Sequence, residues 1–240
     1  IEHEGRLIGA RCSDASLGDL ATLYISNYRE PWYCPVLPTL TDPNQGTRIA
    51  LSGAVAGEIT GLVSHGGRVY VWTAGDMHVL IGDQPLEFSV RPFAPHGCIA
   101  HRTIQKLESR IFWAAADGVY IAQEGVGLRR ISDDLETSYR AISIADLSRL
   151  HAFVYDSKYF LCWPNGSWWY DVRYEIWGEN DNWPWNVSTA GLYQGTNRPR
   201  IFAGRAASPR AWELETGTRG KAGRPWPILP PSCRPRGHPC

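Results

Sequence analysis

GRVYVWTAGDMHVLIG, the stretch Gly67–Gly82, contains the pattern that decides the fold. A basic residue opens a short apolar and aromatic run, turn residues interrupt it, and a second apolar run follows. The pattern recurs three more times, in Ser109–Gly125, Ser157–Asp171 and Arg198–Glu213. Paired apolar runs around a turn are typical of antiparallel hairpins, so the sequence predicts four of them.

Turn residues mark where these hairpins fold back. Asp117-Gly118 and Asn165-Gly166 predict two-residue type I′ turns, because such dipeptides tolerate positive φ at both central positions. Ala74-Gly75-Asp76 predicts a slightly longer turn in the first hairpin. The turns therefore support the assignment of hairpins rather than of helices.

Each hairpin follows another predicted strand. These strands lie at Glu58–Ser64, Thr103–Leu107, Leu150–Tyr155 and Ala190–Gly195. Their first residues are separated by 45, 47 and 40 positions. A four-stranded propeller blade occupies about 40–50 residues, so this spacing predicts an all-β protein, a β-propeller-like array of antiparallel hairpin blades. Fourth strands are predicted at Leu128–Ser132 and Glu175–Gly178, and an earlier, less regular blade at Arg6–Ala10 with Leu20–Ser26.

Both faces of the predicted strands are apolar. In the first hairpin Val69, Val71 and Thr73 face one side. Tyr70 and Trp72 face the other, because successive side chains of a strand alternate. A sheet covered on both sides has this pattern, whereas a sheet with one wet face alternates apolar and polar residues. We therefore expect the blades to stack face to face.

Little of the chain predicts helix. The candidates are Leu135–Ile144 and Leu147–Leu150, with Asp133 and Asp134 as N-caps of the first. The proline-punctuated connection from Asn27 to Thr47 is predicted to be irregular.

The C-terminal stretch differs in composition from the rest. From Thr218 onward Gly and Pro dominate, which predicts an extended segment. We predict a β-propeller-like domain over residues 1–217 and an extended basic Gly/Pro-rich tail over residues 218–240. The chain begins with Ile1 rather than methionine, and Arg6–Ala10 has nothing before it to pair with. We interpret it as a piece of a longer polypeptide.

The net charge is zero but unevenly distributed. Thr218–Cys240 carries five basic residues and no acidic residue, which leaves a net charge of −5 on Ile1–Gly217. This body has no electrostatic reason to hold nucleic acid, so DNA can pass close to it without binding. No apolar run approaches the roughly 20 residues of a membrane-spanning helix, and no membrane contact is expected.

The sequence lacks the local motifs of common catalytic and metal sites. It has no GxSxG elbow, no GK[ST] phosphate loop and no CxxC, HxH or HxxxH pair. The six scattered cysteines are interpreted as buried thiols. His96, Cys98 and His101 are close enough in sequence for a metal constellation, but we interpret them as ordinary loop or strand residues. We predict that the chain is not an enzyme and holds no cofactor or metal.

Paired acidic residues are the remaining candidates for catalysis. Glycosidases need two carboxylates at a defined separation, which the sequence does not reveal. The candidate pairs are Asp133 with Asp134, Glu179 with Asp181, and Glu213 with Glu215, and we interpret them as solvated turns or helix caps. Gly125-Val126-Gly127 is interpreted as a turn between strands.

Six tryptophans fall within 23 positions, at Trp163, Trp168, Trp169, Trp177, Trp183 and Trp185. Tryptophan buries a large area and keeps one N–H donor. Three interpretations stay open: a core between blades, an interface between subunits, and stacking on sugar rings. The basic tail has two open interpretations, contact with DNA phosphates and an arm that clasps a neighbouring subunit. Its prolines favour the arm, because a stiff proline-rich segment loses little entropy on ordering.

The order of these segments resembles the propeller-containing tail proteins of short-tailed bacteriophages, which form the nozzle or tubular part of the tail. The resemblance covers roughly Gly5 to Glu179. It is carried by the phrases GRLIGA (Gly5–Ala10), Pro31-Trp32-Tyr33, Glu58–Asp83, GCIAHRTI (Gly97–Ile104), GLRRIS (Gly127–Ser132) and RLHAFVYDSKYFLCWP (Arg149–Pro164). The chain is shorter than these proteins, and its tail has no counterpart in them.

The resemblance implies a structural virion protein of a bacteriophage tail, in the nozzle, the tail tube or the head–tail connection. It implies a homo-oligomeric ring, such as a hexamer, with other tail or connector proteins as partners and viral DNA in transient passage. The expected location is the virion, after assembly in the host cytoplasm. We expect the contacts between subunits at Trp177, Trp183, Trp185, Arg219, Arg224, Arg234 and Arg236. The alternative is a glycan-binding or glycoside-cleaving propeller that recognises host surface polysaccharide.

Overall fold

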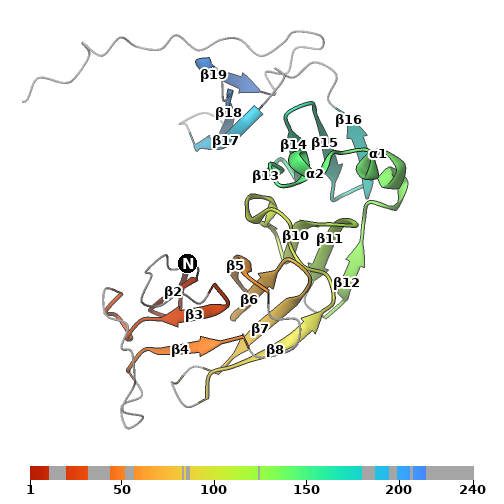
Figure 1. Cartoon of the computed structure of the whole chain (residues 1–240). Helices are drawn as coiled ribbons and strands as arrows, with labels where there is room; N and C mark the ends of the chain where they lie inside the picture. The colour runs from red at the N-terminus through yellow and green to blue at the C-terminus, as the bar shows by residue number, and fades with distance from the viewer. Residues whose placement is uncertain are drawn as a thin grey trace, which may run out of the picture. The chain divides into compact units, whose positions relative to one another are not determined.

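The computed structural model describes residues 1–10, 20–31, 44–51, 57–82, 84, 87–123, 125–179, 187–194, 199–205 and 208–214. The chain divides into two compact units, Ile1–Leu150 and His151–Cys240, and each is described by itself. Figure 1 shows the elements of both units, coloured along the chain. The predicted boundary between residues 217 and 218 lies outside the described residues and stays a prediction.

Three four-stranded sheets make up the described part of the first unit (Figure 1). The first sheet contains β1 (Glu2–His3), β2 (Arg6–Ala10), β3 (Thr22–Ile25) and β4 (Thr47–Ala50). The second contains β5 (Ile59–His65), β6 (Arg68–Thr73), β7 (Met77–Ile81) and β8 (Ser89–Ala94). The third contains β9 (Gln105–Leu107), β10 (Arg110–Ala115), β11 (Gly118–Gln123) and β12 (Gly127–Arg130).

Two further sheets belong to the second unit. The fourth sheet contains β13 (His151–Tyr155), β14 (Lys158–Trp163), β15 (Gly166–Asp171) and β16 (Ile176–Glu179). The fifth contains β17 (Val187–Gln194), β18 (Pro199–Arg205) and β19 (Ser208–Leu214), and β17 lies against β13 and β14. In every sheet the spatial order of the strands follows the sequence and the pairing is antiparallel, which is the meander of a propeller blade.

The predicted hairpins are confirmed as β6–β7, β10–β11, β14–β15 and β18–β19. The strands predicted before them are β5, β9, β13 and β17, and the predicted fourth strands are β12 and β16. The earlier, less regular blade that was predicted at Arg6–Ala10 with Leu20–Ser26 corresponds to the first sheet. Three outer strands, β1, β4 and β8, were not predicted, and β4 begins at the end of the connection that was expected to be irregular.

The turns of two hairpins fall one residue earlier than predicted. Ala116–Asp117 joins β10 to β11, and Pro164–Asn165 joins β14 to β15. None of these residues has a positive φ. A type I′ turn needs a positive φ at both central residues, whereas Pro164 holds its φ near −65°. The prediction of type I′ turns was therefore wrong. Two-residue turns with positive φ at both positions occur instead between the first and second strands, at Glu4-Gly5, Gly66-Gly67 and Asp156-Ser157.

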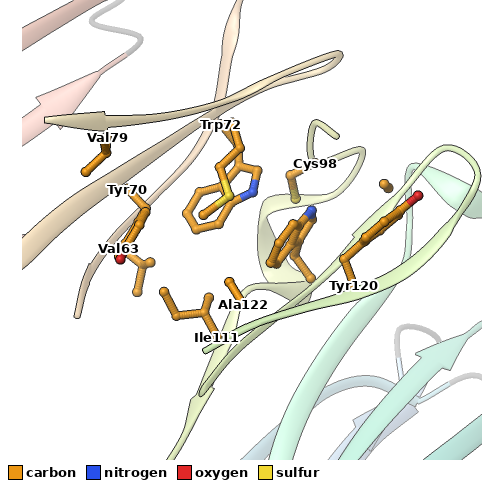
Figure 2. Close-up of a cluster of buried hydrophobic side chains, with 11 residues drawn as sticks. Val63, Tyr70, Trp72, Val79, Cys98, Ile111, Tyr120 and Ala122 are labelled. Atoms are coloured by element: carbon orange, nitrogen blue, oxygen red, sulfur yellow. The ribbon is translucent and has the colours of Figure 1, made fainter. Parts of the chain in front are cut away.

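The second sheet packs against a neighbouring sheet on each of its faces. Val69 and Val71 enter a core between the first and second sheets, together with Ile8, Leu23, Ile25, Leu51, Ile59 and Leu80. Tyr70 and Trp72 enter a core between the second and third sheets, which Figure 2 shows, together with Val63, Met77, Val79, Cys98, Ile111, Trp113, Ala115, Tyr120 and Ala122. The predicted division of β6 into two apolar faces is therefore confirmed.

These packed meanders define the fold class. The protein is all-β, an array of antiparallel four-stranded blades of the β-propeller kind with little helix, as predicted. The inner strands are buried on both faces, as the burial of nearly all of β6, β10 and β14 shows. Outer strands such as β8 and β12 are largely exposed or half-buried, because nothing beyond them within their own sheet covers their outer edge.

Short helices follow the third sheet in the sequence. A 3-10 turn (Asp133–Leu135), α1 (Glu136–Arg140) and α2 (Ile144–Leu147) replace the predicted helices. Asp133 and Asp134 lie inside the 3-10 turn and cap neither helix, so that prediction was wrong. The cap of α2 is Ser143, whose hydroxyl accepts from the Asp146 N–H at 3.2 Å. Among the described residues no helix is long and apolar enough to span a membrane.

Candidate functional site

The candidate site among the described residues is the outer strand of the fourth sheet, where one predicted interface residue lies. Trp177 is in β16, and its ring packs on Tyr170 of β15 with ring centroids 5.2 Å apart. The other predicted interface residues, Trp183, Trp185, Arg219, Arg224, Arg234 and Arg236, lie outside the described residues. Their roles stay predictions.

Among the described residues β16 is the outermost strand of its sheet, because β15 is the only described strand that pairs with it. Its register places Trp177 opposite Tyr170 and Ile176 opposite Asp171. One side of the backbone of an edge strand has unpaired N–H and C=O groups, which can pair with a strand of another chain. The place of this strand in its sheet makes it a candidate for a contact with another chain.

Apolar side chains are exposed at this edge. Ile176 is 51% exposed and Tyr174, in the turn before the strand, is 71% exposed. Neither residue was singled out from the sequence, because an alternating pattern does not reveal which apolar residue of an outer strand remains uncovered. Exposed aromatic and aliphatic side chains that lie together mark interaction sites more often than isolated ones. We call Tyr174, Ile176 and Trp177 the β16 edge.

An ion pair between buried Asp171 and exposed Arg173 holds the turn that carries Tyr174. Asp171 is only 3% exposed, and its carboxylate accepts from Arg173 Nη2 at 3.0 Å and from Arg173 Nε at 3.2 Å. The Arg173 backbone N–H also donates to Asp171 Oδ1 at 2.9 Å. These bonds hold the pKa of Asp171 below its usual value, chiefly through the Arg173 side chain. The guanidinium of Arg173 in turn lies 5.7 Å from the Tyr174 ring centroid, so a cation–π contact helps to position the exposed ring.

The remaining described tryptophans of the cluster belong to the sheet itself. Trp168 is buried and packs on Trp163 at 4.4 Å between ring centroids. Trp169 lies across Gly178 of β16, where a Cβ atom would approach its ring to 2.2 Å, and Lys158 Nζ lies 4.6 Å from its ring centroid. These rings do not form an open row, so the core interpretation holds for Trp168 and no flat sugar-stacking platform is present among the described tryptophans.

The histidine and cysteine candidates do not form a metal site. His96 stacks on Tyr120 with centroids 4.3 Å apart, and its Nδ1 lies 3.9 Å from Asp117 Oδ2. His101 is exposed in a 3-10 turn, and Cys98 is fully buried. In the described part of the chain no three His, Cys, Asp or Glu residues are placed to hold a metal ion.

Cys98 should be chemically inert in the native chain. Its thiol donates to the Ala100 carbonyl at 3.3 Å, and burial raises its pKa to about 12. Because the thiolate is the reactive form, we expect no alkylation of Cys98 by iodoacetamide at pH 8 and full alkylation in urea. Mass spectrometry of proteolytic fragments measures both. Rapid labelling of Cys98 in the native chain would contradict the structure.

The acidic pairs gain no support as catalytic groups. Asp133 lies 3.4 Å from Arg130 Nε in a surface ion pair, and Asp134 is exposed. Glu179 is exposed at the end of β16, while Asp181 and the side chains of Glu213 and Glu215 lie outside the described residues. Gly125 and Gly127 adopt φ values of +76° and +100°, so the Gly-Val-Gly segment is a turn, as predicted.

Comparisons with known proteins find only distant structural similarity. No protein-family model matches the chain, and no curated protein matches it significantly. Among solved structures, similarity is found to PorZ, a bacterial surface component of the type-IX secretion system of Porphyromonas gingivalis, with 12% identity, a TM-score of 0.47 and coverage of 93% of this chain and 25% of that one. The WD40 domain of SCAP from fission yeast has 12% identity, a TM-score of 0.42 and coverage of 86% and 51%. The AfRom2 CNH domain has 16% identity, a TM-score of 0.40 and coverage of 82% and 62%.

The chain spans less than two thirds of each of these three structures. At such identities and TM-scores they say nothing about its activity or partners.

Proposed function

We propose that the chain is a structural subunit of a multimeric assembly, and that this assembly is the tail of a short-tailed bacteriophage, where the subunits form a ring around the DNA channel. The observation that supports assembly is the β16 edge. It combines the outermost described strand of its sheet with Ile176 and Tyr174, which are 51% and 71% exposed. The phage tail itself follows from the resemblance of the segment order.

The stacked blades suit a mechanical role. Large side chains such as Trp72, Trp113 and Phe112 are completely buried, so the first unit has a closely packed interior. Close-packed interiors have low compressibility and resist deformation. The zero net charge of the chain suits a wall that DNA passes without being held.

The contact is expected to form between copies of this chain. Exposed apolar side chains lie at the β16 edge, on the outermost described strand of its sheet, and pairing with a strand of another copy would cover them. Arg173 and Glu179 flank the apolar residues with opposite charges. Antiparallel pairing of two copies about Ile176 would place Arg173 of each copy opposite Glu179 of the other. Opposite charges would then face each other across the contact.

Substitution at the β16 edge tests this proposal. We expect Ile176→Asp, alone or with Tyr174→Ser, to weaken self-association about tenfold or more, which is about 1.4 kcal/mol. Analytical ultracentrifugation measures the oligomeric state, and circular dichroism checks the fold. The matched control is Ile144→Asp in α2, because Ile144 is 85% exposed and lies in the other unit. Unchanged assembly of the Ile176→Asp variant would contradict the proposal.

Two further measurements separate the tail from other assemblies. Deletion of Thr218–Cys240 is expected to weaken ring formation, since the basic tail is the other predicted contact. Images of intact phage particles should show the chain as a ring in the tail. A chain that forms no ring, but whose tryptophan fluorescence responds to millimolar host polysaccharide, would favour the glycan-binding alternative.

A further inference from the structure

A pocket of about 360 Å³ opens at the rim between the second and third sheets, in the first unit. Tyr70 of β6 and Ile111 and Ala122 of the third sheet line it, and Figure 2 shows these three side chains together at one end of the shared core. The floor of the pocket is therefore an extension of the protein core toward solvent.

The walls of the pocket are apolar and exposed. Phe93 of β8 is 41% exposed and meets Tyr70 edge-on, with ring centroids 5.6 Å apart. Val126 is 77% exposed at the tip of the β11–β12 turn. Gly125 and Gly127 hold it there with φ values that favour glycine, +76° and +100°. A valine displayed in this way contributes nothing to the core and is available to a ligand.

Among the described residues that line the pocket, Arg68 has the only permanent charge. Arg68 lines the pocket at the start of β6, opposite His65 across the Gly66-Gly67 turn. Arg68 is exposed and makes no hydrogen bond or ion pair with any described residue. None of the described residues that line the pocket is acidic.

The repeat makes the state of Arg68 unusual. A basic residue opens the second strand of each of the first four sheets, at Arg6, Arg68, Arg110 and Lys158. Arg6 donates to backbone carbonyls, and Arg110 Nε donates to Gln123 Oε1 at 3.1 Å. Lys158 lies over the Trp169 ring. At the equivalent position Arg68 alone has no such partner among the described residues.

We propose that this pocket binds an extended segment of another protein, which inserts one aromatic or large aliphatic side chain and places a carboxylate one or two residues away against Arg68. The inference goes beyond self-assembly, because it concerns a different surface and a different chain. A carboxylate is the charge complement of an unpaired guanidinium, which can bind it with two parallel hydrogen bonds.

The dimensions fit one anchoring side chain. Ligand pockets range from roughly 300 to 1,000 Å³, and this one lies at the small end. Buried aromatic anchors in such pockets dominate the affinity of many interfaces, while exposed ion pairs contribute less and give selectivity. The apolar side chain should therefore set the affinity, and Arg68 should set the preference for acidic neighbours.

Binding of peptides to the full chain tests the proposal. A displayed library of random heptapeptides should enrich an aromatic or large aliphatic residue followed within two positions by Asp or Glu. Synthetic, fluorescein-labelled peptides of the selected sequence are then compared by anisotropy at low salt. Replacing the anchor with Ala should weaken binding about thirtyfold, and replacing the acid with its amide about threefold.

Variants of the chain assign these effects to residues. Arg68→Glu should reverse the preference, so that peptides with Lys in place of the acid bind better. Phe93→Ser should weaken all peptides and leave the preference intact. The matched control is Arg91→Glu, because Arg91 is exposed on the same sheet and does not line the pocket. Absence of an enriched motif, or the same acidic preference in Arg68→Glu, would overturn the proposal.

Discussion

Replacement of Trp113 by alanine is expected to lower the free energy of unfolding of the first unit by about 3–5 kcal/mol, the range for loss of a large aromatic side chain from a core. Trp113 is completely buried in the core between the second and third sheets. Its ring packs on Trp72 at 5.5 Å and on Tyr120 at 5.8 Å between centroids. These two neighbouring rings cannot fill the space that the lost indole leaves.

Urea unfolding of the full chain measures the effect, followed by circular dichroism and by hydrogen exchange of β6 and β10. The control is Trp113→Phe, which keeps an aromatic ring and removes the bond from Nε1 to the Gly97 carbonyl at 3.1 Å. It should lower stability by about 1–3 kcal/mol, the effect of an unsatisfied buried acceptor together with some lost volume. A loss below about 1 kcal/mol for Trp113→Ala would contradict the packing of these two sheets.

The core of the first unit illustrates what the sequence predicts well. The alternation of Val69 and Val71 with Tyr70 and Trp72 predicted two buried faces, because only a sheet covered on both sides tolerates it. The structure places the two pairs in two different cores. Inner strands with this pattern were predicted together with their hairpin partners.

The outer strands β1, β4 and β8 were not predicted, because their residues follow no regular apolar pattern. Strand β8 contains Arg91 and Pro92, and proline is excluded from central strands because it lacks the N–H donor. At an edge, Pro92 faces His78 without breaking the ladder on which β7 depends. Strand β4 follows a proline-rich connection and is only four residues long. Such strands form because an already folded hairpin provides a partner.

The candidate site was predictable only in part, for a related reason. Trp177 was identified because tryptophans cluster around it, and the structure places it half-buried in β16. The exposure of Ile176 and Tyr174 depends on which strand is outermost, and that is a property of the sheet order. That Arg68 has no partner among the described residues could likewise be seen only in the structure, since the sequence has a basic residue at all four equivalent positions.

Arg6 is the buried counterpart of Arg68 and carries the second large prediction. Arg6 is only 6% exposed. Its Nη1 donates to the carbonyls of Ser26 at 2.9 Å, Gln45 at 2.8 Å and Asn44 at 3.3 Å. Its guanidinium also lies 5.6 Å from the ring centroid of Phe88, the residue before β8. Arg6 therefore joins the end of β3 to the segment that leads into β4.

Replacement of Arg6 by leucine is expected to lower the free energy of unfolding by about 3–5 kcal/mol. Several backbone carbonyls would lose their donor in a site that leucine closes to water, and each unsatisfied buried acceptor costs about 1–3 kcal/mol. Arg6→Lys should lie between, because an ammonium reaches fewer of the carbonyls. The equivalent substitution Arg68→Leu should change stability by less than about 0.5 kcal/mol, since Arg68 is exposed. Urea denaturation measures all three variants, and equal effects of Arg6→Leu and Arg68→Leu would show that burial does not distinguish the two positions.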